Sequence, residues 1–415
     1  MKIFILILLP FSLISKEFNI SSKGANFDGE KINITGKVIL SHPLGKIEAD
    51  NGYIKKIKNK KNFFSLIYLN QASLLLNKGK ITSKKAIFEK ETKKIKFLTD
   101  VKYTEKDLNI KSKKAECFST DLKNFKISFL KNVFFNYQKL LKIKAEKIFF
   151  IKDEITFFAN SKNLISFKHK NIKADATFAK FIPKDNSFFL KNSKGIFYFE
   201  DKDINFSANQ LFLNKEKAVL NDNAILIYNP YKISSSKIEF FYNNQKIEKI
   251  ISYDNSNLYS PIYKIFSKNP ITFNLLKNTI YSKGDIYFFK DQIKIYAQKA
   301  LIKTKAIKNK LEIKKIELEK NVSFIKKKDE DDITLALSDK IKFNPFSNSI
   351  KLESYKDNKV LFWQSKNDFS LSAKKIKIFF KENEKIQGYG KVRFSLNPPE
   401  KILLQKTFEK FLNNE

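Results

Sequence analysis

The sequence predicts an all-β protein made of many short antiparallel strands, followed by one short C-terminal helix. Three observations predict this. Apolar residues recur at every second position along most of the chain, similar segments return about every 30 residues, and helical periodicity is confined to the last twenty or so residues. With 415 residues, the chain is long enough to bury a large core or to form two or three domains.

The chain begins with a short apolar run, IFILILLPFSL, which follows Lys2 and is followed by the small residue Ser15. A positive start, about a dozen apolar residues and a small residue before a polar segment are typical of a secretory signal. The run is too short for a spanning helix, although a buried strand would have a similar composition. We therefore expect residues 1–15 to be a signal peptide that exports the chain. No cysteine follows the run directly, so we do not expect lipoprotein processing.

The body of the chain is expected to consist of strands. Segments such as LKIKAEKIFF and DINFSANQLFL alternate apolar and polar residues, and turns fall at clusters such as NKGK and NNQK. No linker composition interrupts these segments. We expect residues 16–165 to form one β domain and residues 166–396 to continue it, either as a second domain or as part of one continuous domain.

A small residue recurs in these segments, usually with apolar residues three and five positions later. The small residues lie mostly about 27 to 35 positions apart, and they are Ala49, Ser83, Ser112, Ala145, Ala174, Ala208, Ser235, Ala297, Ser338 and Ala373. The two later positions share one face of a strand, whereas strict alternation puts the small residue on the other face. A bulge or tight bend would instead turn it inward, and the sequence leaves both interpretations open.

The C-terminal segment 397–415 predicts a short amphipathic helix. Asn397 is a capping residue, Pro398 suits the first helical position, and Glu400 lies three residues after the cap. One apolar stripe is formed by Leu404, Phe408, Phe411 and Leu412. The helix either caps the open end of the β structure or docks on a partner.

Motifs for catalysis, metal binding or phosphate binding are missing from the sequence. Its two histidines, His42 and His169, have no Cys or His neighbour at metal spacing, and we interpret His42 as a hairpin-loop residue. Cys117 occupies a repeat position filled elsewhere by Phe, Ile and Leu, and Trp363 is interpreted as a packing residue. We expect a non-enzymatic protein without cofactor or metal; a lipid-modifying enzyme with an unrecognised pair of carboxylates is the alternative.

The formal net charge is +37, yet Arg393 is the only arginine. Arginine supplies the planar fork that reads phosphates and bases, so we do not expect a nucleic-acid partner. The abundance of Lys, Asn, Ile and Phe is typical of an AT-rich coding bias, and a charge of this size favours solubility. The other interpretation of the basic surface is contact with anionic partners.

The stretch ITGKVILSHPLGKIEADNGYI, residues 34–54, resembles the N-terminal motif of the OstA/LptA superfamily, the periplasmic lipopolysaccharide-transport β-jelly-roll. The motif positions are occupied by Gly36, Val38, Ile47, Ala49, Asp50 and Tyr53. Tyr53 comes one place earlier than the family spacing, and Gly52 stands where the family often has Ala. Strong resemblance covers about residues 18–88, and weaker, repeat-level resemblance reaches about residue 396.

The resemblance implies an extended open β-jelly-roll, or β-taco, with lipid A acyl chains between its two sheets. It implies a periplasmic protein that bridges the inner and outer membranes and conducts lipopolysaccharide. Its partners would be lipopolysaccharide and, end to end, related β-jelly-roll domains of the inner- and outer-membrane transport proteins, with self-oligomers as a further possibility. A phospholipid cargo is a close variant. The alternative is an exported structural or surface β-repeat protein without lipid cargo.

Candidates for the lining of a lipid groove are the apolar residues of the best motif copies, namely Val38, Leu40, Ile47, Phe88, Phe150, Leu213 and Ile302. A closed, dry β core would place the same residues inside, so both interpretations stay open. An acyl chain of about a dozen methylenes gains on the order of 10 kcal/mol on leaving water, at about 0.8 kcal/mol per CH₂. A carrier must therefore offer a continuous apolar surface.

Overall fold

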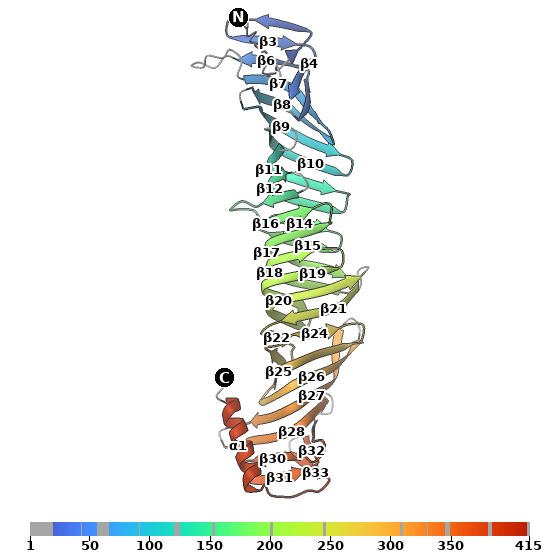
Figure 1. Cartoon of the computed structure of the whole chain (residues 1–415), viewed down its shortest axis with the longest axis vertical. Coiled ribbons are helices and arrows are strands. Elements are labelled where there is room, and N and C mark those ends of the chain that lie inside the picture. Colours follow the sequence, from blue (N-terminus) through green and yellow to red (C-terminus); the bar gives the residue numbers. More distant parts are fainter. Residues whose placement is uncertain are drawn as a thin grey trace, which may run out of the picture. The chain divides into compact units, whose positions relative to one another are not determined.

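The computed structural model of the chain describes residues 20–412, apart from 43, 56–65, 91, 120–124, 152–153, 200–201, 244–245, 308–309, 330, 345–348 and 381–383. The predicted signal peptide, residues 1–15, lies outside the described residues. Within the described part, the chain forms thirty-three strands and one helix, and neighbouring strands pair antiparallel (Figure 1). The predicted all-β class is therefore confirmed. The chain divides into two compact units, Met1–Ile165 and Ser166–Glu415.

The first unit, called unit 1, has short strands at its start and longer strands after them. Strands β7 to β12 have 11 to 13 residues each. The strands are β1 (Ile20–Ser21), β2 (Gly24–Phe27), β3 (Lys31–Thr35), β4 (Val38–His42), β5 (Gly45–Ala49), β6 (Asn51–Lys55), β7 (Leu66–Leu76), β8 (Gly79–Glu89), β9 (Lys94–Glu105), β10 (Leu108–Ser119), β11 (Phe125–Tyr137), β12 (Leu141–Ile151) and β13 (Glu154–Phe158).

The second unit, called unit 2, mixes short and long strands, and its longest strand, β27, has 18 residues. The strands are β14 (Ile165–His169), which begins at the last residue of unit 1, β15 (Ile172–Ala176), β16 (Phe178–Ile182), β17 (Ser187–Phe199), β18 (Lys202–Leu213), β19 (Lys217–Tyr228), β20 (Tyr231–Asn243), β21 (Lys246–Tyr253), β22 (Ser256–Tyr259), β23 (Lys264–Ser267), β24 (Ile271–Asn274), β25 (Thr279–Lys290), β26 (Ile293–Ile307), β27 (Lys310–Lys327), β28 (Ile333–Asn344), β29 (Ser349–Glu353), β30 (Val360–Gln364), β31 (Phe369–Ala373), β32 (Lys375–Phe379) and β33 (Lys385–Tyr389). One helix, α1 (Pro398–Leu412), follows them.

A corner near the middle of each long strand divides it between two sheet halves, which we call arms. In β8, Ser83 is buried, the next two residues are exposed lysines, and Ala86 is buried again. The pairing of β8 with β9 shifts register between Thr82 and Lys85, which marks a β-bulge. The bulge lets the strand keep its apolar side inward on both sides of the corner.

The recurring small residues lie at these corners. Register shifts fall at Ser83, Ser112, Ala208 and Ala297. Nine of the ten small residues are buried and Ser235 is half-buried. The hydroxyls of Ser83, Ser112 and Ser235 donate to the carbonyl two residues later at 2.8, 2.9 and 2.7 Å, which fixes the bend locally. The bulge interpretation of the repeat is therefore right, and strict alternation fails at these positions.

The strands that alternate with the bulged ones turn the corner in another way, with residues in the left-handed backbone region. Pairs with positive φ occur at Lys131–Asn132, Asp222–Asn223 and Lys320–Asn321. Asn and Asp tolerate this backbone region better than branched residues do. Neighbouring strands therefore turn the same corner with two different local devices.

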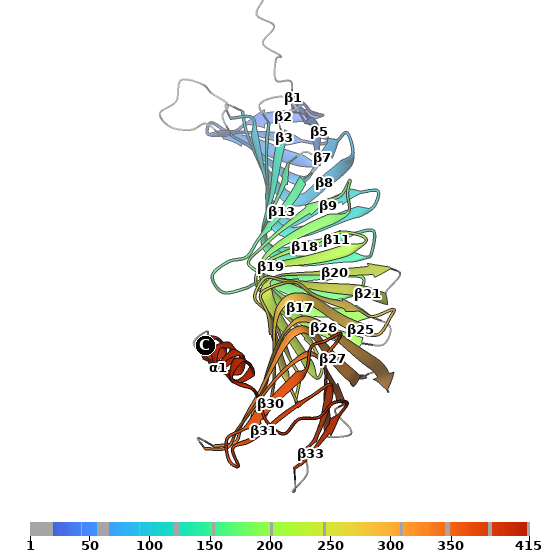
Figure 2. The ribbon, with the colours of Figure 1, turned by 60° about the horizontal axis from the view of Figure 1, so that its bottom comes forward.

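The two arms of each unit face one another. In unit 1, arm A contains β3, β6 and β13, and arm B contains β4 and β5; in unit 2, arm A contains β16, β21 and β24, and arm B contains β15, β22 and β23. The long strands, seen bending in Figure 2, belong to both arms. Rings of opposite arms meet inside: the Tyr103 and Phe150 centroids are 6.1 Å apart in unit 1, and those of Phe197 and Phe240 are 4.5 Å apart in unit 2. Side chains therefore fill the interior at these places.

The C-terminal helix begins with the predicted capping box. The Glu400 N–H donates to Asn397 Oδ1 at 3.0 Å, and the Asn397 N–H donates to Glu400 Oε2 at 2.8 Å. Leu404 and Phe408 are buried against the outer side of β27, β28 and β30. The helix thus covers an outer face of arm B, beside the corner, instead of the last strand β33. The side chains of Phe411 and Leu412 lie outside the described residues.

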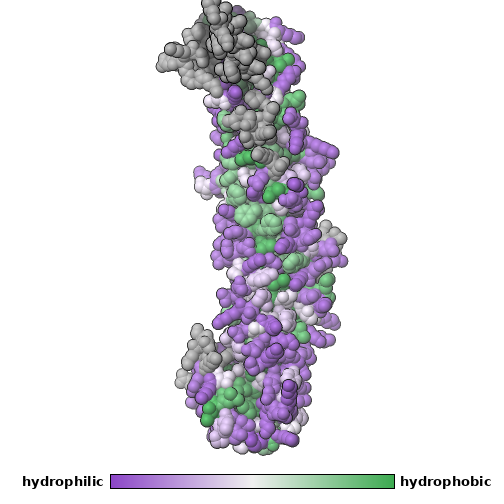
Figure 3. Space-filling view, in the orientation of Figure 1, coloured by the Kyte–Doolittle hydropathy of each residue, from purple (hydrophilic) through white to green (hydrophobic). Residues whose placement is uncertain are grey.

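The outward surface of each unit is mostly polar, and hydrophilic side chains cover much of the face seen in Figure 3. The described part of the chain contains no helix with the length and apolarity of a membrane span.

Candidate functional site

Inner side chains of unit 1 line up in rows, because each one sits opposite its partner on the next strand. One row of arm A consists of Ile32, Ile54, Ile67, Phe88, Ile95, Cys117, Ile127, Phe150 and Ile155. One row of arm B consists of Leu40, Ile47, Leu74, Ile81, Tyr103, Ile110, Phe135 and Ile143. Neither row contains a charged side chain, so two apolar surfaces face each other along the unit.

Unit 2 repeats this arrangement over more strands. One row of arm A consists of Phe181, Phe188, Leu213, Ala218, Phe240, Ile250, Phe273, Ile280, Ile302, Ile316, Phe343, Ile350, Ile378 and Ile386. One row of arm B consists of Ala174, Gly195, Phe206, Leu226, Ile233, Leu258, Ile265, Phe288, Ile295, Phe324, Ala336, Phe362 and Leu371. Both rows are entirely without polar side chains.

The seven predicted groove residues all lie on these inner faces. Six belong to the rows above, and Val38 lies two residues before Leu40 on β4, opposite Ala49. Six of the seven side chains are at most 4 % exposed, whereas Phe150 is half-buried. Opposing side chains cover them in this state, so their role as a lipid lining stays a prediction.

Of the residues of the family-like motif, Val38 and Ile47 lie on the inner face, and the others build the first corner. Gly36 has φ +72°, and a Cβ there would lie 2.7 Å from Lys23 Cβ, which explains the glycine. Buried Ala49 ends β5, and exposed Asp50 joins it to β6. Tyr53 turns outward and stacks on Tyr68 with ring centroids 4.5 Å apart. These positions therefore serve the fold.

His42 joins the two arms of unit 1 at the edge opposite the corner, which we call the mouth. Its Nδ1 accepts from the Leu44 N–H at 3.1 Å, so Nε2 carries the proton and donates to the Lys93 carbonyl at 3.0 Å. The ring also lies 5.8 Å from that of Phe88. Burial lowers the pKa of His42, while its bond to the Lys93 carbonyl acts in the opposite direction. The interpretation as a hairpin-loop residue needs correction: His42 ends β4, directly before the hairpin turn, and is 7 % exposed.

His169 has a similar place in unit 2. It ends β14, and its ring centroid lies 5.0 Å from that of Phe188 in arm A. Burial, followed by the charge of Lys170, lowers the pKa of His169 to about 4. Both histidines are therefore neutral at pH 7 and contact a phenylalanine of an inner row. The only sign of this contact in the sequence is that each histidine ends an alternating segment, directly before a turn.

Four buried serines interrupt the apolar interior of unit 2 near its corner. Ser252 donates to Ser256 at 2.6 Å, and Ser267 and Ser282 hydroxyls lie 3.2 Å apart. Ser282 also donates to the Pro270 carbonyl at 3.0 Å. In these strands the corner falls in the breaks between the short strands β21 and β22 and between β23 and β24. The serines satisfy one another, so they form a structural cluster.

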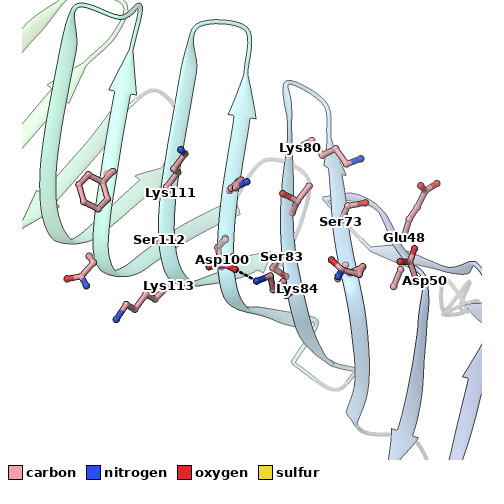
Figure 4. Close-up of a pocket in the computed structure, with 18 of the residues that line it drawn as sticks. Glu48, Asp50, Ser73, Lys80, Ser83, Lys84, Asp100, Lys111, Ser112 and Lys113 are labelled. Atoms are coloured by element: carbon pink, nitrogen blue, oxygen red, sulfur yellow. Dashed lines mark ion pairs between the residues drawn. The ribbon is translucent and has the colours of Figure 1, made fainter.

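A basic groove lies on the corner of unit 1 (Figure 4). It has a volume of about 1180 Å³, and six lysines and three carboxylates line it: Lys37, Lys80, Lys84, Lys102, Lys111, Lys113, Glu48, Asp50 and Asp100. Lys84 pairs with Asp100 at 2.6 Å, and Lys37 with Glu48 at 3.5 Å. Lys102 and Lys111 sit directly opposite each other on β9 and β10. Sequence reasoning did not find this groove, because lysines are frequent throughout the chain.

Within the described residues, no group of three or more His, Cys, Asp or Glu side chains is arranged to hold a metal ion. Cys117 is fully buried in an arm A row, and burial raises the pKa of its thiol. Trp363 packs beside the α1 contact and donates to Asp368 at 3.1 Å, in keeping with a packing role.

Comparison with known proteins finds similar chains among solved structures only. No family model matches the chain, and no curated protein matches it. Among solved structures, it is similar to LptH, the LptA homologous periplasmic component of the conserved lipopolysaccharide transport device from Pseudomonas aeruginosa. The TM-score is 0.27 and the sequence identity 11 %, over 33 % of this chain and 95 % of that chain.

Proposed function

We propose that the chain is a non-enzymatic lipid carrier that holds acyl chains between its arms and conducts lipopolysaccharide across the periplasm. The observation that supports this best is the pair of facing apolar rows that run through each unit. Rows without charged side chains offer an acyl chain apolar contact at every strand. The motif at residues 34–54 and the signal-like N-terminus support the choice of cargo and compartment.

Lipid would enter from the mouth. Strands join the arms covalently at the corner, whereas at the mouth of unit 1 the contacts between arms include side-chain bonds such as that of His42 with the Lys93 carbonyl. Parting the arms there exchanges contacts between inner side chains for contacts with an acyl chain. Both environments are apolar, so the exchange costs little hydrophobic free energy.

Movement along a unit would follow from the repetition of the rows. Each strand contributes the same kind of apolar side chain to a row, so successive positions of an acyl chain along the row have similar energies. A chain bound in this way can advance without meeting a deep minimum. Direction must come from elsewhere, since the sequence contains no phosphate-binding loop.

Exposed sheet edges would serve end-to-end assembly with related β domains or with a second copy. Among the described strands, β2 pairs only with β3, and β33 pairs only with β32. An edge strand can accept a further strand from a neighbour. Either edge would extend the sheet of its unit.

Photocrosslinking in cells tests the lipid role. A photoreactive phenylalanine analogue replaces Phe150 or Leu213 on the inner face, with outward Lys147 and Phe212 on the same strands as matched controls. We expect lipopolysaccharide adducts at positions 150 and 213 and none at 147 and 212. Adducts of phospholipid alone would correct the cargo. A folded, exported protein with no lipid adduct would favour the structural β-repeat alternative.

A further inference from the structure

A cleft of about 1060 Å³ lies on the outside of unit 2, beside α1. Its size is slightly above the roughly 300–1,000 Å³ that ligand pockets span. Corner residues of strands β25 to β28 and the turn between β29 and β30 form one wall, and Leu403, Lys406 and Thr407 of α1 belong to the other. The apolar rows of the interior do not line this cleft, so it is separate from the proposed lipid path.

Two tyrosines form part of the floor of the cleft. Tyr287 and Tyr296 sit opposite each other on β25 and β26, with ring centroids 5.4 Å apart. Both are half-buried, and their row continues through Ser323 to Leu337, which packs against the α1 contact. The electron-rich face of a tyrosine ring attracts the weakly positive C–H groups of a sugar ring. A floor of this kind therefore suits a pyranose.

Paired polar side chains form the corner wall. Tyr296 donates to Asp285 at 2.7 Å, Asn321 donates to Gln298 at 3.1 Å, and Asn358 donates to Asp339 at 3.1 Å. Carboxylates accept from sugar hydroxyls, and amides both donate and accept. Because these side chains already hold one another, a ligand loses less free energy in ordering them.

One buried hydroxyl in the lining has its hydrogen-bonding capacity unused. Ser354 lines the cleft and is 7 % exposed, and its Oγ makes no hydrogen bond within the described part of the chain. A buried polar atom in this state is costly, and a ligand hydroxyl would satisfy it.

The charges of the cleft nearly cancel. Its lining contains Lys268, Lys359, Lys406, Asp285, Asp339, Asp357 and Glu400. Glu400 already receives the helix-capping bond and pairs with Arg393. A lining with three lysines and four carboxylates does not favour a polyanion, in contrast to the basic groove of unit 1.

From the tyrosine floor, the amide and carboxylate wall and the near-neutral charge, we propose that this cleft binds an oligosaccharide. The saccharide can belong to a glycolipid or to a glycan that has no lipid. The recognition chemistry is the same for both, and the site works independently of acyl-chain binding.

Isothermal titration calorimetry on the full-length protein tests this proposal with three probes that contain no acyl chain. They are the deacylated saccharide of lipopolysaccharide, an N-acetylglucosamine trimer and maltotriose. We expect at least one to bind, and we expect Tyr287→Ala and Asn358→Ala to weaken that binding about fivefold to tenfold. Tyr281→Ala is the matched control, because Tyr281 is an exposed tyrosine on the same strand but on arm A; it should leave binding unchanged.

The outcomes separate the sources of the ligand and can overturn the site. Binding of the deacylated saccharide assigns a glycolipid source, and binding of the trimer or maltotriose alone assigns a lipid-free glycan. No binding of any probe at millimolar concentration overturns the proposal. So does binding that both Tyr287→Ala and Asn358→Ala leave unchanged while circular dichroism shows an intact sheet. Because no probe has an acyl chain, failure of the lipid proposal would not produce either result.

Discussion

The corner of unit 1 and the corner of unit 2 have a related construction, but the outer surface is basic in unit 1 and nearly neutral in unit 2. In both, a bulge turns the long strands while small or left-handed residues keep the apolar side inward. Outside, unit 1 presents six lysines against three carboxylates, whereas unit 2 presents three lysines against four carboxylates, two tyrosines and a wall of α1. The bend requires little of the outward side chains, so the outer surface can differ while the inner rows stay apolar.

The largest effect on the free energy of unfolding is expected in the inner rows, which are apolar in both units. Phe88→Ala in unit 1 and Phe240→Ala in unit 2 each remove a fully buried ring, and each should lower the free energy of unfolding of its own unit by about 3–5 kcal/mol. Trp363 is the only tryptophan and lies in unit 2. Denaturant unfolding followed by Trp363 fluorescence should therefore shift with Phe240→Ala only, while far-UV circular dichroism reports both variants.

An equal shift of the fluorescence transition by both variants would contradict this expectation. It would mean that the units unfold as one cooperative structure, and the comparison between them would then apply only to their surfaces. Exposed Phe134→Ala in unit 1 is a control, because its removal leaves no cavity.

A smaller effect on stability is expected from charged side chains on the outer surface of unit 2. Lys340 bonds Glu317 and Glu319 at 2.6 Å each, and both Lys340 and Glu317 side chains are 12 % exposed. Burial acts to raise the pKa of Glu317, but hydrogen bonds from Lys315 and Lys340 outweigh it and lower the pKa to about 2. A carboxylate with a lowered folded-state pKa stabilises the fold above its unfolded pKa, and this contribution is lost as the pH falls through the folded value.

We therefore expect unit 2 to lose on the order of 2–3 kcal/mol of stability from this group as the pH falls from about 5 to 2. The measurement is the unfolding midpoint by Trp363 fluorescence at a series of pH values. Glu317→Gln should flatten this part of the profile and lower stability at pH 7. A profile that is the same with and without Glu317 would show that the pair adds no net stability.

Local patterns predicted the parts of the fold that depend on neighbouring residues. Alternation placed Phe88 and Leu213 inward, and the spacing of Asn397 and Glu400 gave the start of the helix. The contacts across each unit were out of reach, because periodicity carries no information about distant partners. His42 reaches Lys93, 51 positions away, and the cleft of unit 2 joins Tyr287 to Thr407. The contact of His42 depends on how the two arms of unit 1 close, and the cleft depends on where α1 packs on unit 2.

The smallest effect concerns the like charges in the groove of unit 1. Lys102 and Lys111 are exposed and directly opposed on adjacent strands, and neither forms an ion pair within the described residues. Directly opposed like charges repel, whereas opposite charges attract. Lys111→Glu should therefore stabilise unit 1 by about 0.5 kcal/mol at low salt.

The gain should shrink as salt is added, because salt screens exposed charges over about 10 Å at 0.1 M. Far-UV circular dichroism during urea unfolding measures it, and Lys111→Gln, which removes the repulsion without adding attraction, should give an intermediate value. A loss of stability in Lys111→Glu would mean that Lys111 already has a favourable environment in the groove. The folded surface of unit 1 would then hold its excess lysines in favourable positions. The contrast with the neutral cleft of unit 2 would come from these surroundings and not from lysines that repel one another.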